Sequence, residues 1–289
     1  MSKEQMANDK KISGHGSGNI DSVISVEDVE KQVQALASDR PSVEKLKALT
    51  DNKPFLSIED LHAGYGRMEI LHGLNLYVGK GQSLCLIGPN GAGKSTILHA
   101  IYGFNQIMSG KISVDGKDLT DQSPNTKLST AGIAYVLQDN SVFPDMTVEE
   151  NLLMGGYLLP RHEAKQAAEK ILERYDRLGN RKNQRAGVLS GGERRLLEIS
   201  RALIMNPEIL LIDEPSIGLE PRFINMVFDI LTELRDIDGK TIIMVEQNAK
   251  KGLEFADIGY VLVSGELAMA GAGDDLLADP AVGRLFLGG

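Results

Sequence analysis

The stretch GPNGAGKST, residues 88–96, constrains the fold of this chain more than any other part of its sequence. It follows the apolar run SLCLI and precedes a helical pattern, which is the strand–loop–helix context of the phosphate loop G-x-x-x-x-G-K-[ST]. Glycines let successive backbone N–H groups face one anion, and the start of the helix adds its positive dipole end. The candidate phosphate-contacting residues are Gly88, Pro89, Asn90, Gly91, Ala92, Gly93, Lys94, Ser95 and Thr96.

Two side chains of this loop carry the charge and metal chemistry of a nucleotide site. Lys94 is expected to neutralise the β and γ phosphates of a bound nucleotide. Ser95 is expected to give its hydroxyl to Mg²⁺, which prefers hard oxygen ligands and keeps several waters. The alternative, a glycine-rich turn with a surface lysine, leaves the complete motif in its context unexplained.

A second apolar run, EILLIDEP at 208–215, ends in two adjacent acids. Neighbouring carboxylates at the end of a buried strand repel each other and are costly unless a cation lies near. A magnesium ion held at Ser95 would supply that cation. Asp213 is therefore expected to serve the metal, and Glu214 to accept a proton from an attacking water. Without the phosphate loop, the same pair would indicate only a turn before Pro215.

Short strands and turns begin at Pro54, and strands then alternate with helical patterns towards the C-terminus. This alternation predicts an α/β domain over 54–289, with a mainly parallel central sheet fed by antiparallel strands. Residues 147–186 are strongly helical and charged, which predicts a helical insertion at about 139–190.

Residues 1–53 form a polar N-terminal extension that includes the Gly/Ser-rich spacer SGHGSGN. We expect this extension to be mostly disordered with short helices, or to be an arm that docks on a partner or on the domain itself.

Charge and composition limit the classes of partner and the compartment. The net charge is -9, so we expect no nucleic-acid partner. No run approaches the roughly 18 apolar residues of a membrane span, and the N-terminus lacks the apolar core of a signal peptide. The single cysteine, Cys85, lies in an apolar run and is expected to be a small buried hydrophobe. These features predict a cytosolic chain that reaches a membrane only through a partner, at its cytoplasmic face.

The segment LSGGERRLLEISRAL, residues 189–203, predicts a capped helix and a second anion-binding element. Ser190 and Glu193 form an S-x-x-E capping box. Gly191 and Gly192 leave the N–H groups of the first turn unobstructed, and such a helix start attracts anions.

A phosphate loop, then LSGGE, then LLIDEP resembles the ATP-binding cassette ATPases, over about residues 55–289. The resemblance implies a P-loop NTPase cassette with a RecA-like parallel-sheet core, an antiparallel β subdomain and an inserted helical subdomain, which hydrolyses ATP with Mg²⁺. In that family two cassettes pack head to tail. Ser190, Gly191, Gly192 and Glu193 would then contact the ATP that the partner's phosphate loop holds.

The same resemblance implies further site residues. Tyr65, in AGYG, matches the aromatic residue that stacks on adenine, although a half-buried strand tyrosine stays an alternative. Gln138 matches the glutamine that reaches Mg²⁺ and the attacking water. The implied catalytic set is Glu214, Gln138 and Gln247, and the implied metal set is Ser95, Gln138 and Asp213.

Gln247, in MVEQNA, stands where the wider family usually has a histidine. Its amide can donate a hydrogen bond to the γ-phosphate but does not titrate near pH 7. This segment and the ending LLADPAVGRLFLGG resemble the ATP-binding subunits of branched-chain amino acid uptake systems, and their relatives for urea and short amides. That resemblance implies a second, different cassette subunit, two membrane permease subunits and, indirectly, a periplasmic binding protein. The alternatives are other cassette transporters, a soluble cassette protein acting on ribosomes or DNA, and a non-hydrolysing regulator.

Overall fold

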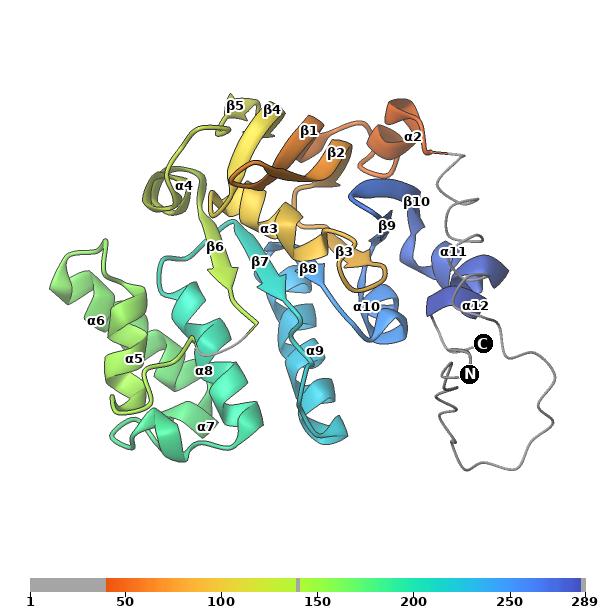
Figure 1. Ribbon diagram of the computed structural model, residues 1–289. Coiled ribbons are helices and arrows are strands. Elements are labelled where there is room, and N and C mark those ends of the chain that lie inside the picture. The colour runs from red at the N-terminus through yellow and green to blue at the C-terminus, as the bar shows by residue number, and fades with distance from the viewer. Residues whose placement is uncertain (1–39, 139–140, 287–289) are drawn as a thin grey trace, which may run out of the picture.

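The computed structural model describes residues 40–138 and 141–286, which form two β-sheets surrounded by helices (Figure 1). The strands are β1 (Pro54–Tyr65), β2 (Met68–Gly79), β3 (Ser83–Ile87), β4 (Gln106–Val114), β5 (Lys117–Asp118), β6 (Ile133–Val136), β7 (Ile209–Asp213), β8 (Thr241–Val245), β9 (Ile258–Val263) and β10 (Glu266–Ala272). The helices are α2 (Val43–Ala48), α3 (Lys94–Tyr102), α4 (Pro124–Ala131), α5 (Val148–Gly155), α6 (Arg161–Arg174), α7 (Asp176–Gly179), α8 (Gly191–Leu203), α9 (Pro221–Asp236), α10 (Ala249–Phe255), α11 (Gly273–Ala278) and α12 (Pro280–Phe286).

The larger sheet has the strand order β10-β9-β3-β8-β7-β6, and only its β10–β9 pair is antiparallel. The smaller sheet, β2-β1-β4-β5, is antiparallel, and α3 lies between it and the larger sheet (Figure 1). Helices α5 to α7 form a helical subdomain to one side of the larger sheet (Figure 1). The predicted α/β cassette fold is confirmed, with its parallel core, antiparallel subdomain and helical insertion.

Strand β7 is buried on both faces, which explains why its sequence is a continuous apolar run rather than an alternating one. Leu210 and Ile212 pack in the cluster that includes α8 and α9, whereas Ile209 and Leu211 pack in the cluster that includes α3 and the antiparallel sheet. Strand β8 alternates in the same way. In β3, Cys85 is fully buried as predicted, and this burial raises the pKa of its thiol.

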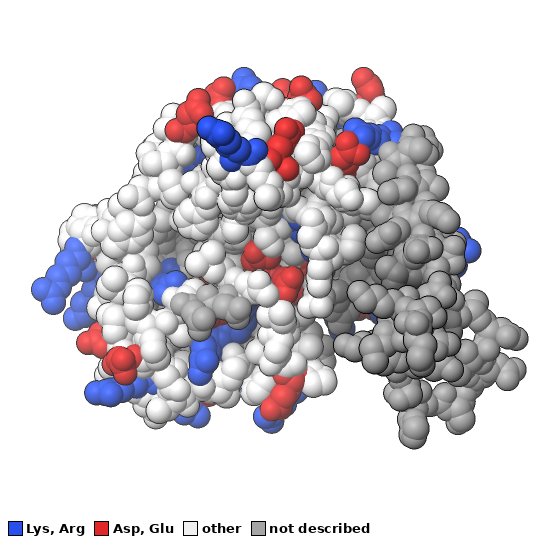
Figure 2. All heavy atoms as spheres, viewed as in Figure 1, with Lys and Arg blue, Asp and Glu red and all other residues white. Residues whose placement is uncertain are grey.

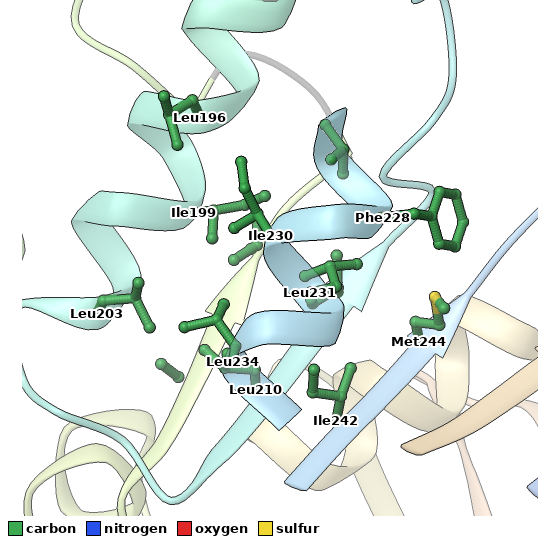
Figure 3. Packing of buried hydrophobic residues seen from close by; sticks show 14 of the residues in the cluster. Leu196, Ile199, Leu203, Leu210, Phe228, Ile230, Leu231, Leu234, Ile242 and Met244 are labelled. Atoms are coloured by element: carbon green, nitrogen blue, oxygen red, sulfur yellow. The ribbon is translucent and has the colours of Figure 1, made fainter. Parts of the chain in front are cut away.

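Helices α8 and α9 cover one face of the sheet with facing apolar stripes (Figure 3). Leu196, Ile199 and Leu203 of α8 recur at spacings of three and four, which places them on one face of the helix. They lie towards Ile230 and Leu234 of α9 in Figure 3. This packing fixes α8 against the sheet, and with it the segment LSGGE that begins the helix.

Part of the predicted extension folds onto the domain. Ser42 caps α2 by accepting a hydrogen bond from the backbone N–H of Lys45, and Leu46 is buried in the core cluster of the antiparallel sheet. The side chain of Gln82 donates to the carbonyl of Leu49. The prediction for residues 1–39 lies outside the described residues and stays a prediction. Within 40–138 and 141–286, no helix has the length and apolar character needed to cross a bilayer.

Candidate functional site

Four neighbouring parallel strands end at the same edge of the larger sheet. The strand registers pair Val245 of β8 with both Leu86 of β3 and Asp213 of β7, and pair Ile212 of β7 with Val136 of β6. Ligands of open parallel sheets bind at this carboxyl edge. The chain continues from these strands into the phosphate loop, Gln247, Glu214 and Gln138.

A cavity of about 500 Å³ lies at this edge. The predicted site residues that line it are Tyr65, Asn90, Gly91, Gly93, Lys94, Ser95, Thr96, Gln138, Glu214 and Gln247. Acidic side chains lie in the middle of this face, over the end of β7 (Figure 2). The structure therefore brings the phosphate loop together with all three predicted catalytic side chains.

The phosphate loop is shaped by glycines and closed by its own lysine. Gly88 has a φ of 148°, and a Cβ there would lie 2.3 Å from the carbonyl oxygen of Leu262. The Nζ of Lys94 donates to the carbonyls of Gly88 at 2.9 Å and Pro89 at 3.0 Å, which holds the loop curled around the start of α3. Burial lowers the pKa of Lys94, while the carboxylates of Glu214 and Asp213 act in the opposite direction.

Ser95 and Asp213 bring two oxygen atoms together that could serve as metal ligands. The Ser95 hydroxyl donates to Oδ1 of Asp213 at 3.1 Å, and the Tyr135 hydroxyl donates to Oδ2 at 3.0 Å. A hydroxyl and a carboxylate fit Mg²⁺, which commonly uses one or two carboxylates together with substrate phosphates. Among the described residues, no group of three or more His, Cys, Asp or Glu could hold a metal ion. The metal set predicted from the sequence adds Gln138, which lines the same cavity.

The side chains of Glu214 and Gln138 contact each other in the same cavity. Nε2 of Gln138 donates to Oε2 of Glu214 at 3.0 Å, and the backbone N–H of Glu214 donates to the carbonyl of Val245. Glu214 has a φ of 46°, a left-handed conformation that costs a non-glycine residue on the order of 1–3 kcal/mol. Such strain clusters at functional sites, and here it turns the carboxylate of a strand end towards the cavity.

An aromatic cluster extends from the outer side of the cavity. The hydroxyl of Tyr65 and Nδ1 of His99 form a hydrogen bond, and the His99 ring contacts those of Phe104 and Tyr135 edge-on. Tyr65 is 45% exposed, so its ring is accessible to a base. Burial lowers the pKa of His99, which favours a neutral imidazole beside this tyrosine. His99 was not predicted to lie at this site, although its place four residues after Ser95 puts it on the same face of α3.

The predicted signature residues lie elsewhere on the same chain. Ser190 caps α8, and its reciprocal bonds with Glu193 confirm the predicted capping box. None of the four residues from Ser190 to Glu193 lines the nucleotide cavity. Gly192 has a packing role that was not predicted, because a Cβ there would lie 2.2 Å from the ring of Phe223 in α9. The start of α8 therefore lies apart from the nucleotide cavity.

Glu246, directly after β8, was not among the predicted site residues. It does not line the cavity, but it is buried and accepts bonds from the hydroxyl of Ser216 at 2.7 Å and the N–H of Asn248 at 2.8 Å. Ser216 lies two residues after Glu214, so the Glu246 carboxylate links the loop after β7 to the loop after β8, which contains Gln247. The only sequence feature that could have indicated this contact is a polar residue directly after a buried strand.

The fold and this cavity define a class of phosphate-loop ATPase, and comparison with known families agrees. The model of the ABC transporter family matches residues 71–217. The chain belongs to the ABC transporter family, and it binds ATP and hydrolyses it in a reaction coupled to transport.

Relatives with more specific names lie within that family. The chain is 42% identical to a high-affinity branched-chain amino acid transport ATP-binding protein, BraG of Pseudomonas aeruginosa, over 81% of this chain and 100% of the relative. It is 37% identical to a probable branched-chain amino acid transport ATP-binding protein, LivF of Archaeoglobus fulgidus, over 79% of this chain and 96% of that one. A crystal structure of a nucleotide-free ATP-binding cassette from an ABC transporter superposes with a TM-score of 0.72 at 30% identity, covering 82% of this chain and 100% of that chain.

Proposed function

We propose that this chain is the ATPase subunit that powers import of branched-chain or other hydrophobic amino acids. The observation that carries the proposal is the end of β8, where Gln247 lines the nucleotide cavity in a chain 42% identical to a branched-chain amino acid transport ATP-binding protein. The substrate would not touch this chain. It would bind the permease and a periplasmic protein, so the role of this chain is to convert ATP hydrolysis into a movement of its partners.

The side chains around the cavity divide the work of hydrolysis. Tyr65 would stack on adenine, a contact worth on the order of 1–3 kcal/mol. Lys94 would exchange its two carbonyl acceptors for the β and γ phosphates. Gln138 would orient the attacking water, and Glu214 would accept its proton. Ser95, Asp213 and Gln138 would hold Mg²⁺, which would supply positive charge to the phosphate oxygens when bound.

The separate position of the signature residues favours a head-to-tail dimer of cassettes. Ser190 and Gly191 are exposed at the start of α8, where the free N–H groups and the helix dipole attract an anion. Since the cavity of the same chain lacks them, a partner's γ-phosphate is the anion that they would meet. Ile217 is 40% exposed and lines both the nucleotide cavity and the cavity beside Gly191, so the loop after Glu214 would reach such an interface.

A second cavity, of about 540 Å³, offers a docking site for the permease. It lies between β6 and the helices α5 and α8, and its lining includes Phe143, Met154 and Tyr157, all exposed apolar side chains. An amphipathic helix binds to a groove of this kind through its apolar face. We propose that a cytoplasmic helix of the permease occupies it, which would place this chain at the cytoplasmic face of the membrane.

Replacing Met154 with glutamate tests this contact. A buried carboxylate without a partner opposes docking, so Met154→Glu is expected to reduce recovery of the membrane subunits at least tenfold in co-purification from membranes. ATP binding should stay unchanged, because Met154 lies outside the nucleotide cavity. The matched control is Ile237→Glu, since Ile237 is 77% exposed at the end of α9, away from the groove. Equal recovery of two permease subunits with Met154→Glu and with the unaltered chain would contradict this docking site.

Gln247→His tests whether this side chain faces the γ-phosphate. Histidine can titrate where glutamine cannot, so the hydrolysis rate is expected to become pH-dependent between about pH 6 and 8. The steady-state rate of phosphate release, measured across that range, reports the change. Asn248→His is the control, because Asn248 caps α10 and does not line the cavity. If the rate and pH profile of Gln247→His match those of the unaltered chain, Gln247 has no role at the phosphate.

A further inference from the structure

Arg195, on the second turn of α8, contacts both catalytic segments of the chain. It is only 5% exposed. Its Nη1 donates to the backbone carbonyl of Leu137 at 2.8 Å, and its Nη2 donates to the backbone carbonyl of Asp213 at 2.9 Å. These carbonyls belong to the residues immediately before Gln138 and Glu214. One guanidinium therefore holds the backbone next to both Gln138 and Glu214, the two residues proposed to orient and deprotonate the attacking water.

The contacts close a ring of interactions. Arg195 holds the residues that precede Gln138 and Glu214, and these two side chains meet through their own hydrogen bond at 3.0 Å. A shift of Arg195 would therefore change the separation or the orientation of the Gln138–Glu214 pair. Displacements of about 1 Å at such a pair can lower a rate by about a hundredfold.

The chemistry of a guanidinium suits this task. Its planar fork presents several N–H groups in fixed directions, so one carbonyl just after β6 and one at the end of β7 can be held at one geometry. The charge of Arg195 is balanced inside the protein by Glu198, whose Oε2 lies 2.8 Å from Nη1. Glu198 lies one turn further along α8 and is also buried, so both members of the ion pair belong to this helix.

We propose that Arg195 is a positioning residue for ATP hydrolysis, which couples helix α8 to the Gln138–Glu214 pair. Ser190 and Gly191 begin this same helix, so an anion bound at its start and the hydrolytic pair are joined through one rigid element. Movement of α8 relative to the sheet would thereby align or misalign the pair. This inference rests on the roles proposed for Gln138 and Glu214.

Arg195→Lys separates positioning from simple packing. Lysine keeps the charge opposite Glu198 but cannot reach both carbonyls with a fixed fork. We expect kcat for ATP hydrolysis by the full chain to fall at least tenfold, with KM for ATP and the calorimetric affinity for ATP within about threefold. The melting temperature should stay within a few degrees, because the buried charge remains paired. A purely structural role would lower the melting temperature and the activity together.

Three further variants complete the design. Arg194→Lys is the matched control, since Arg194 is the neighbouring arginine of α8 and is exposed; its kcat should stay within about twofold. The double variant Arg195→Gln with Glu198→Gln removes both buried charges and the fork together, so it gives the same test if Arg195→Lys does not fold. Glu214→Gln is measured beside them.

The outcomes are distinct. If Glu214→Gln is inactive and a folded Arg195 variant keeps full kcat, the positioning role of Arg195 is overturned while the proposed function stands. If Glu214→Gln is fully active, the proposed mechanism itself fails. If kcat falls with KM unchanged in the Arg195 variants alone, the positioning role is supported.

Discussion

Replacing Glu214 with glutamine is expected to lower the ATP hydrolysis rate by two to three orders of magnitude, roughly the contribution of a general base. Glutamine has the same size and can still accept the hydrogen bond that Gln138 donates at 3.0 Å, so the cavity should keep its shape. The proton acceptor alone is lost. ATP should therefore bind at least as tightly as before, as measured by calorimetry alongside phosphate release.

Glu208→Gln is the control for this variant. Glu208 lies just before β7, at the end opposite to Glu214, and forms an exposed ion pair with Lys80 at 3.0 Å. Such surface pairs contribute little to stability, so hydrolysis should be unaffected. Undiminished hydrolysis by Glu214→Gln would remove Glu214 from the mechanism.

Replacing Lys94 with alanine is expected to weaken ATP binding at least tenfold and to lower the rate of hydrolysis. Two effects act in the same direction. The counter-charge of the phosphates is lost, and the carbonyls of Gly88 and Pro89 lose the donor that holds the loop curled. Isothermal titration with ATP and with ADP measures the loss.

Lys117→Ala, at an exposed site on the edge strand β5, controls for loss of a positive charge at a distance from the cavity. Its ATP affinity should equal that of the unaltered chain. An ordinary affinity in Lys94→Ala would show that the backbone N–H groups and the helix start hold the phosphates without this side chain.

Local patterns predicted the elements of this fold well, because their causes are local. The capping box at Ser190 was predictable from a four-residue spacing, and it forms as predicted. The apolar run at 208–215 predicted a buried strand, and β7 forms within it. The phosphate loop was predictable because its glycines, lysine and hydroxyls all lie within the single stretch 88–96.

Contacts between distant segments could not be predicted in the same way. Arg195 reaches carbonyls 58 and 18 residues away, and a backbone carbonyl leaves no trace in the sequence. The bond between Glu246 and Ser216 depends on the register of two strands and on the loop between Asp213 and α9. The spacing of His99 from Ser95 on α3 could have been noticed in the sequence, but its partner Tyr65 ends β1 of the antiparallel sheet, 34 residues earlier.

The N-terminal boundary of the folded domain could not be predicted fully from composition, which placed it at Pro54. The polar stretch before Pro54 contains α2, whose single buried leucine, Leu46, joins the core of the antiparallel sheet. A few apolar residues in a short charged segment form a weak pattern, and only the surface that receives them makes the helix stable.

Uptake by the assembled transporter tests the central claim most directly. Vesicles holding the chain with the proposed permease subunits and binding protein would be loaded with ATP and given radiolabelled leucine, isoleucine, valine or urea. We predict ATP-dependent accumulation of the three amino acids, its loss with Glu214→Gln, and no accumulation of urea. Accumulation of urea alone, or export of a substrate, would contradict the assignment to branched-chain amino acid import.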